Sequence, residues 1–558
     1  MRVSKLEKII SVVLFILTWV VLALQGGHPI FSDELLYIDA GLNNMQVPSY
    51  GNRYFHVYLQ KLFMTLAPTP VSGIGIYWGF LIALTALLVY WNARSFFKHS
   101  TPLHGIIAVA IFFSYRFIAQ YCGVTSVDIT AMTMVLVLLT IYLTYIRSGR
   151  KLSWAPFVLG ALVFLCFKTK ETTLFSFVIL LGLLFDGQGK FSLQDLVPIL
   201  KPLAIGFALA IGLFILLDTV FLHNPFFAIS PATLSEVFKN YAYTGGFRRE
   251  PSSYYNYLLV TIMLPFLLYL VSGIKRYGSE TSPHLKIVWL FPLVLAFFMT
   301  LNMLKIPWGF IERFYFPALP VIALLAPQFI DFSWPRTNPE KIKFIGLLLL
   351  GVGLVFMGRQ TFMSWTAEIQ WDYGKFLNTM YYPLLLSILL GFILFIRRFT
   401  WLSSVIPLIC IFAILLAPLA HTYKYIFRVP NTDASFNLLY YPFIAFEETI
   451  HYSPEMSFYL SPAIQNELHM LSLNRDELVA MFNVFFDSST RQSNFTIGWE
   501  PEKLLEDITQ QTYDYVLLTQ AEWSKISANL IHKQSLEDRY AHWVDSEKQV
   551  VLLSARAG

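Results

Sequence analysis

Residues 8–37 read KIISVVLFILTWVVLALQGGHPIFSDELLY, an apolar run followed closely by two adjacent carboxylates, Asp33 and Glu34. The run is long enough to cross a bilayer, and the carboxylates stand where this first crossing should leave the membrane. Removing an ionised carboxylate from water is costly unless the group is paired or hydrated. We therefore expect Asp33 and Glu34 to face a water-filled cavity on the outer side of the membrane.

The composition of the whole chain indicates an α-helical polytopic membrane protein. Of the 558 residues, 56% are hydrophobic and only 13% are charged, whereas soluble domains contain about 25% charged residues. The net charge of +5 does not indicate a nucleic-acid partner, because many basic residues lie in short loops between apolar runs. The three cysteines lie in or beside apolar runs, so neither a disulfide framework nor a thiolate metal site is expected.

Apolar runs recur along the chain and predict about thirteen membrane-spanning helices. The runs lie at about 9–26, 71–91, 105–121, 127–146, 153–167, 172–186, 200–221, 256–274, 287–302, 314–330, 342–358, 379–396 and 401–420. The first run is long for a signal peptide, and no small-residue cleavage site follows it, so it is interpreted as a retained span. Basic residues place the N-terminus in the cytoplasm, and every loop that alternation makes cytoplasmic is also basic. The chain after residue 420 is then extracytoplasmic.

Many charged residues fall on the predicted outer side, which is unexpected for random placement and indicates one shared, outward-facing site. The candidate site residues in this group are Asp33, Glu34, Arg53, Asp128, Lys168, Lys170, Glu171, Arg248 and Arg313. Arg116 lies inside an apolar run, about one turn from its outer end. An arginine there is expected to pair with an acid, for which Asp128 and Asp33 are candidates.

These residues also have structural interpretations. Asp33 and Glu34 would suit the start of a helix through capping and the helix dipole. The lysines of the segment 168–171, KTKE, could reach lipid headgroups by snorkelling instead of binding a phosphate. Asp128 could simply cap the fourth span. The loop that contains Arg248 could cover a site or be an ordinary surface loop.

The chain is predicted to form two domains. The first is a transmembrane catalytic domain, 1–420, whose long outer segment 28–70 holds two amphipathic helices, around 35–42 and at 53–66. The second is a small α/β domain outside the membrane, 421–558, because apolar runs shorten there and charges rise. Its predicted strands are 457–460, 513–519 and 549–554, and its predicted helices are 475–486 and 500–512.

The order of these motifs resembles that of a known family. An Asp-Glu pair stands in a long first outer loop, and an Asp stands near the fourth span. A Lys-Glu pair occupies the hairpin between the fifth and sixth spans, and Arg-x-Tyr-x-Pro-x-x-Pro follows at 313–320. This pattern resembles the GT-C glycosyltransferases of the dolichyl-phosphate-mannose protein mannosyltransferase and lipid A aminoarabinose transferase type. The resemblance covers residues 1–420 and implies a GT-C fold.

The resemblance implies inverting transfer of a sugar from a polyprenyl-phosphate donor to an acceptor at the outer face of the plasma membrane. Asp33 matches the catalytic carboxylate, with Glu34 as its neighbour. Asp128 matches the acid of the second outer loop. Lys170 and Arg313 match basic positions near the donor phosphate.

The chain departs from many relatives at residues 52–56, NRYFH, where they carry a His-Pro-Pro stretch. The acceptor, which could be a protein, a lipid or a glycan, is therefore not specified. A divalent metal would be compatible with two carboxylates in a row, but no His/Cys cluster marks a site, so no cofactor is predicted. The predicted partners are the polyprenyl-phosphate sugar and the membrane lipids.

Two other classes of membrane protein remain as alternatives. A transporter or flippase of lipid-linked saccharides predicts midplane polar residues and matching broken helices in two halves, but the charges gather at one side and no repeat is found. An oligosaccharide ligase or polymerase predicts a large outer loop late in the membrane region, whereas the long loops are at 28–70 and 222–255. A sensor or scaffold would leave the outward charge cluster unexplained.

Overall fold

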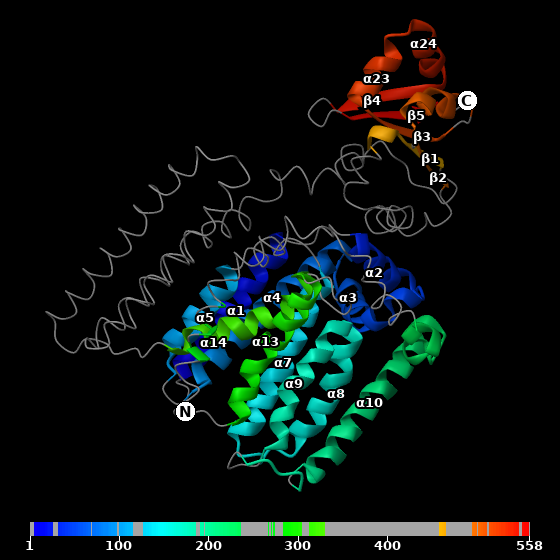
Figure 1. Cartoon of the computed structure of the whole chain (residues 1–558). Helices are drawn as coiled ribbons and strands as arrows, with labels where there is room; N and C mark the ends of the chain where they lie inside the picture. The colour runs from blue at the N-terminus through cyan, green and yellow to red at the C-terminus, as the bar shows by residue number, and fades with distance from the viewer. Residues whose placement is uncertain are drawn as a thin grey trace, which may run out of the picture. The chain divides into compact units, whose positions relative to one another are not determined.

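The computed structural model shows a chain whose described residues are mainly helical, with a small sheet near the C-terminus (Figure 1). It describes residues 5–25, 32–68, 70–97, 100–114, 126–185, 190–194, 196–235, 266, 269–270, 272–273, 283–303, 312–329, 457–464, 494–498, 500–510, 513–545 and 550–556. These residues pack as two units. The first draws on Met1–Gly26, Gln46–His56 and Ile76–Phe427, and the second on Gly27–Met45, Val57–Gly75 and Arg428–Gly558.

Most predicted spans that fall on described residues are helices. The long α-helices are α1 (Lys5–Gln25), α4 (Pro70–Ser95), α5 (Pro102–Ser114), α7 (Val127–Arg147), α8 (Trp154–Thr169), α10 (Val197–Leu222) and α13 (Pro283–Met303). Among the described residues, three helices are long and apolar enough to cross a membrane, namely Ser72–Ser95, Val127–Arg147 and Val197–Leu222. The predicted number of about thirteen spans is therefore not confirmed. The predicted spans at 342–358, 379–396 and 401–420, and the boundary at 420, lie outside the described residues.

Two predicted spans are broken runs of short helices instead of continuous α-helices. The span at 172–186 consists of η2 (Glu171–Ser176), α9 (Phe177–Leu180) and η3 (Leu181–Leu184), and the span at 314–330 of η6 (Glu312–Ala318), α14 (Leu319–Leu325) and η7 (Ala326–Phe329). In the first, hydroxyl groups of Thr173 and Ser176 donate to carbonyls three residues earlier, at 2.8 and 2.6 Å, which suits a tight 3₁₀ turn. In the second, Pro317 lacks the N–H that an α-helix would use.

Helix α7 is the centre of the first unit, because most of its side chains are buried. Polar side chains on it pair with α4 across the interface. The hydroxyls of Thr133 and Thr85 lie 2.8 Å apart, and Asn92 donates to the Thr140 hydroxyl at 2.7 Å. Such bonds between helices satisfy polar groups that have no water to bind in an apolar interior.

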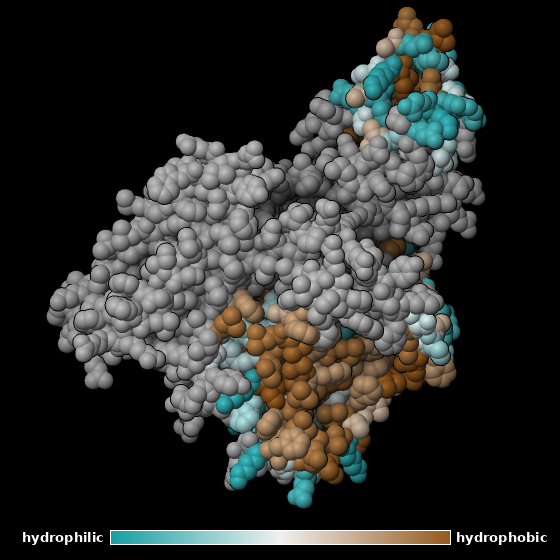
Figure 2. Space-filling view, in the orientation of Figure 1, coloured by the Kyte–Doolittle hydropathy of each residue, from teal (hydrophilic) through white to brown (hydrophobic). Residues whose placement is uncertain are grey.

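Helices α8 and α10 approach each other closely through two glycines. A Cβ atom built on Gly160 would lie 1.9 Å from the carbonyl oxygen of Leu203, and one on Gly206 would lie 1.8 Å from that of Phe157. Figure 2 shows a broad hydrophobic surface over the helical part of the chain. The exposed apolar residues of α10 are Val197, Leu200, Ile205, Leu209, Leu213, Leu216 and Val220. One face of α10 thus packs on α8, and the other suits contact with lipid.

The first helices of the second unit are α2 (Ser32–Asn43) and α3 (Tyr54–Leu66), which confirm the two helices predicted in the first outer segment. Ile38, Met64 and Ile74 form a small buried cluster. Lys61 donates to the backbone oxygen of Gly41 at 2.7 Å, which joins α3 to α2.

The C-terminal part of the second unit is a five-stranded mixed sheet with strand order β2-β1-β3-β5-β4. Its strands are β1 (Ser457–Leu460), β2 (Asn494–Ile497), β3 (Tyr515–Thr519), β4 (Tyr540–Asp545) and β5 (Val550–Ala555), and its helical segments are η9 (Pro501–Lys503), α22 (Leu504–Gln510), α23 (Gln520–Ser527) and α24 (Leu530–Arg539). The three predicted strands and the helix near 500–512 are confirmed, whereas β2 and β4 were not predicted. The helix predicted at 475–486 lies outside the described residues.

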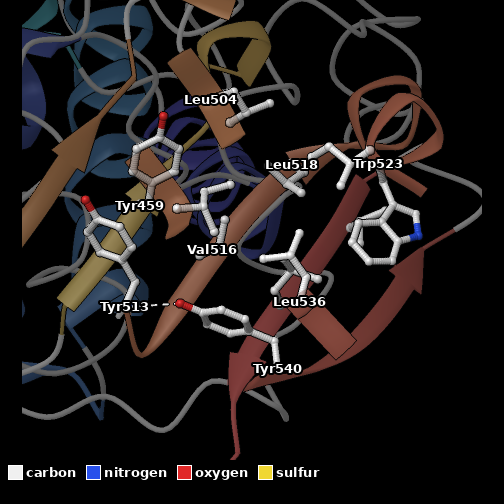
Figure 3. Packing of buried hydrophobic residues seen from close by; sticks show 12 residues of the cluster. Tyr459, Leu504, Tyr513, Val516, Leu518, Trp523, Leu536 and Tyr540 are labelled. Carbon is white, nitrogen blue, oxygen red and sulfur yellow. Dashed lines mark hydrogen bonds between the residues drawn. The ribbon is translucent and has the colours of Figure 1, made fainter. Parts of the chain in front are cut away.

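Aromatic and aliphatic side chains form the core of this sheet (Figure 3). Tyr459, Val516, Leu518 and Leu536 are fully buried or nearly so. The backbone N–H of Tyr513 donates to the Tyr540 hydroxyl at 3.1 Å, so the one polar atom of that ring is satisfied inside the core.

Strands β2, β1 and β3 are parallel, and Glu522 occupies the edge where β1 and β3 end. Its carboxylate accepts hydrogen bonds from the backbone N–H groups of Thr519, at 2.9 Å, and Ala463, at 3.1 Å, and from the Thr519 hydroxyl. In parallel sheets this edge commonly binds anionic ligands through helix N-termini. In this sheet the Glu522 carboxylate accepts hydrogen bonds from the backbone N–H groups at that edge.

The packing of α8 on α10 predicts different effects for two glycines of α10. Gly206→Ala should destabilise the protein by about 1–3 kcal/mol, because the new methyl group would force the helices apart. At Gly212 a Cβ atom would have no neighbouring atom within 4 Å, so Gly212→Ala should leave stability unchanged or raise it by up to about 1 kcal/mol, because alanine is the better helix former. Thermal unfolding of the detergent-solubilised protein measures both, and equal losses would contradict the proposed close contact.

The bonds of Glu522 predict that Glu522→Ala lowers the stability of the C-terminal sheet by about 1–2 kcal/mol, since backbone donors lose their partner. Glu537 makes a surface contact with Lys533, at 3.7 Å, so the matched change Glu537→Ala should cost at most about 0.5 kcal/mol. Hydrogen exchange of β3 amides in the full chain compares the two. Similar exchange in both variants would exclude a special role for Glu522.

Candidate functional site

A buried ion pair joins Lys170 to Asp128. Lys170 follows the last residue of α8 in an extended conformation, and Asp128 lies in the first turn of α7. Both side chains are almost completely buried, and the ammonium group of Lys170 contacts the Asp128 carboxylate. Ser126, whose hydroxyl accepts from the Asp128 N–H, is the N-cap of α7. Asp128 is therefore not the capping residue, and its carboxylate faces a cation.

Lys168 is also buried, and its partners come from two other segments. It donates to Asn52 Oδ1 at 3.2 Å and to the backbone oxygen of Ala228. Asp218 on α10 attracts the Lys168 ammonium electrostatically and accepts a hydrogen bond from the Ala228 N–H at 2.8 Å. Neither Lys168 nor Lys170 extends to solvent, so the snorkelling interpretation is not supported.

Arg53 and Glu171 form the most accessible pair of this cluster. The guanidinium Nη2 lies 3.5 Å from Glu171 Oε1, and the two side chains are 14% and 13% exposed. Arg53 ends η1 (Pro48–Arg53), and Glu171 begins η2. The longer distance and greater exposure make this pair easier to separate than the buried pair of Lys170 and Asp128.

Among the described residues, the cations and carboxylates of this cluster are equal in number. Its members are Arg53, Lys168 and Lys170 on one side and Asp128, Glu171 and Asp218 on the other. Three positive and three negative charges give a formal sum of zero. An anion such as a phosphate would compete with these carboxylates for their cations.

A second buried network, which no sequence pattern predicted, lies on α3, α4 and α7. His56 Nδ1 is 2.7 Å from the Thr130 hydroxyl and 3.1 Å from the Tyr77 hydroxyl, and these hydroxyls are 2.8 Å apart. Thr130 follows Asp128 closely on α7, since the two are separated by a single residue. A polar residue inside an apolar run was the one sequence signal for such a network. Sequence spacing alone does not indicate which polar side chains form hydrogen bonds with one another.

The remaining predicted site residues belong to other segments of the chain. Asp33 and Glu34 lie in the first turn of α2, in the second unit, and Glu34 is 3% exposed. Arg313 lies in η6, a segment that packs against α7. Arg116 and Arg248 lie outside the described residues. Within the part of the chain that is described, no three His, Cys, Asp or Glu side chains gather as metal ligands.

Comparisons with known proteins find similarity in structure alone. No protein-family model and no curated protein sequence matches the chain. The crystal structure of ArnT from Cupriavidus metallidurans bound to undecaprenyl phosphate is 14% identical with a TM-score of 0.52, and the match covers 100% of this chain and 99% of that chain. The apo-state structure of the same ArnT is 13% identical with a TM-score of 0.50, covering 98% and 97%. The fold implied by the sequence motifs is thereby confirmed.

Because the Lys170–Asp128 pair is buried, we expect the loss of stability on replacing one of the two residues to depend strongly on whether the other is present. Lys170→Met should destabilise the protein by about 3–5 kcal/mol, because an unpaired carboxylate would remain buried. The double variant Lys170→Met/Asp128→Asn should recover a large part of that loss. Denaturant unfolding measures the double-mutant cycle.

An exposed ion pair supplies the control for this cycle. Lys503 and Glu500 are both 58% exposed in the C-terminal sheet domain, so Lys503→Met should leave stability unchanged. Strictly additive effects of Lys170→Met and Asp128→Asn would contradict the buried pairing.

Proposed function

We propose that this chain, which has the GT-C fold of the two ArnT structures, is a membrane glycosyltransferase that uses a polyprenyl-phosphate-linked sugar as its donor. The observation that carries the proposal is the cluster of Arg53, Lys168 and Lys170 with their carboxylate partners. One of the similar structures was bound to undecaprenyl phosphate. A lipid phosphate is the kind of anion that arginine and lysine side chains bind.

In the proposed reaction Asp33 is the general base and Glu34 is its supporting neighbour. The Asp33 carboxylate takes the proton of the acceptor group as the acceptor atom forms a bond to the anomeric carbon. The bond from that carbon to the phosphate oxygen breaks, and its electron pair leaves with the polyprenyl phosphate. Attack from the face opposite the phosphate inverts the anomeric configuration.

The basic residues have the proposed role of stabilising the departing phosphate. Lys170, Arg53 and Arg313 would neutralise the growing negative charge, together with Arg116 and Arg248. Lys168, Glu171 and Asp128 complete the proposed substrate site. Because the described cluster is electrically neutral, phosphate binding would release a carboxylate from one cation. The loose Arg53–Glu171 pair is the first candidate.

The proposal includes the arrangement of the protein in the membrane. We place the N-terminus in the cytoplasm and the catalytic part, residues 1–420, in the plasma membrane. The domain at 421–558 is placed on the outer side. The acceptor, which is a protein, lipid or glycan, would approach from that side.

The decisive experiment compares wild type with Asp33→Asn in liposomes supplied with a panel of radiolabelled polyprenyl-phosphate sugars. Wild type should release polyprenyl phosphate and label an acceptor. Asp33→Asn should lower the rate by about 100-fold or more while donor binding persists, because it removes only the base. Asp538→Asn, a matched change at an exposed position of α24, should leave the rate unchanged.

Two results would contradict the proposal in different ways. Equal rates for wild type and Asp33→Asn would remove Asp33 from the catalytic role. If wild type consumes no donor but moves labelled lipid across the bilayer, the chain is a transporter.

A further inference from the structure

Asn52 is a buried side chain with half of its hydrogen-bonding capacity unused. It is 1% exposed, and its Oδ1 atom accepts from Lys168 at 3.2 Å. Its Nδ2 atom has no hydrogen-bond partner among the described residues. A buried donor without a partner is costly and rare in folded proteins, so this one calls for an explanation.

The orientation of the Asn52 amide is determined by Lys168. An ammonium group only donates hydrogen bonds, so the oxygen of the amide must face Lys168 and the NH₂ group must point away from it. Lys168 itself is held by the backbone oxygen of Ala228 and by the charge of Asp218. A flip of the amide would place two donors face to face and is therefore excluded.

The backbone around Asn52 is also held in place. A Cβ atom on Gly51 would lie 1.8 Å from Thr233 Cγ2, so this segment packs directly against the chain after η4 (Phe227–Ile229). The Val47 N–H donates to the Tyr54 hydroxyl at 2.9 Å, and the ring of Tyr54 packs against that of Phe227 with centroids 4.8 Å apart. Segment 47–54 cannot shift to give Asn52 another partner without losing these contacts.

The free NH₂ group lies beside the charged cluster described above. Asn52 and Arg53 are consecutive in η1, and their side chains reach Lys168 and Glu171, which are three residues apart around the end of α8. Thr172, the next residue after Glu171, also has a buried hydroxyl without a partner among the described residues. Each segment that forms the accessible Arg53–Glu171 pair therefore also carries a buried polar group without a partner among the described residues, next to its charged residue.

We propose that Asn52 is a substrate-binding residue whose Nδ2 donates a hydrogen bond to an oxygen atom of the polyprenyl-phosphate sugar. Lys168 is then a positioning residue, which orients the amide. This inference rests on the proposed function and assigns a part of its donor site. A neutral donor adds affinity for an oxygen ligand without disturbing the balance of charges in the cluster. The ligand oxygen belongs to the phosphate or to a sugar hydroxyl.

The test is the isosteric variant Asn52→Asp in the full chain. The new carboxylate keeps the contact with Lys168 as an ion pair, but it presents an acceptor where the amide presents a donor. Binding of undecaprenyl phosphate, with and without an attached sugar, is measured in nanodiscs together with the melting temperature. We expect affinity to fall by about 10- to 100-fold with the melting temperature unchanged or raised.

The control variant is Asn224→Asp. Asn224 lies near the same segment, since its amide donates to Gln46 at 3.1 Å, but this contact is exposed. The Asn224→Asp variant adds the same charge in the same region. Because solvent screens a charge at this exposed position, the variant should leave affinity within about twofold of wild type. Loss of affinity in both variants would attribute the effect to charge alone and overturn the inference.

The two ligands identify the oxygen that Asn52 binds. A loss with both lipids assigns the bond to the phosphate, and a loss with the sugar-bearing lipid alone assigns it to a sugar hydroxyl. Equal affinities of wild type and Asn52→Asp for both lipids overturn the inference but leave the proposed function standing. If wild type binds neither lipid, the proposed function fails and the inference fails with it.

Lys168 variants test the positioning role separately. Lys168→Met should raise KM for the donor, and its effect should not add fully to that of Asn52→Ala. Lys168→Arg, which preserves a donor to the amide oxygen, should restore KM. A loss of kcat without a change in KM, or full additivity with Asn52→Ala, would contradict a role that acts through Asn52.

Discussion

The buried contact between Lys170 and Asp128 is the interaction on which the polar part of this fold depends. An ammonium and a carboxylate that leave water are stable only when they meet each other. Their contact ties the start of α7 to the end of α8. Lys168 follows the same requirement and draws in η1, α10 and η4 through Asn52, Asp218 and the backbone of Ala228. Charge compensation thus brings together segments that are far apart in the sequence.

The same compensation shapes what the cluster can bind. A site with spare positive charge would attract any anion, whereas in a neutral cluster an incoming anion competes with the carboxylates that are already paired. The pair of Arg53 and Glu171 is the least buried and the longest of the contacts, so exchange is easiest there. In the proposed donor site, selectivity then comes from neutral donors such as the Asn52 amide, whose hydrogen bonds depend on direction. A combination of exchangeable ion pairs and directional neutral donors suits a ligand that must bind in one orientation and then be released.

Sequence patterns predicted the parts of this structure that depend on local properties. Long apolar runs predicted α4, α7 and α10, and the charges of Asp128 and Lys170 marked a polar site. Partner choice was not predictable, because it depends on tertiary packing: no sequence pattern joined Asp128 to Lys170, whose side chains meet in the structure. The break of the predicted span at 172–186 and the network around His56 were missed for the same reason. The positions of helix breaks and of buried hydrogen bonds depend on hydroxyl groups and prolines whose partners are set by the packing of neighbouring helices.

Helices α8 and α10 differ in length, which has a consequence for the lipids around them. The 16 residues of α8 and the 26 of α10 correspond to about 24 Å and about 39 Å at the α-helical rise. The hydrocarbon layer of a bilayer is about 30 Å thick, so α8 is shorter than this layer and α10 is longer. The glycine contacts hold the two helices together, and neither can adjust alone. A thicker or thinner bilayer should therefore change the depth in the membrane at which the chain turns at Lys170. The length of the lipid tails would then influence the position of the proposed site.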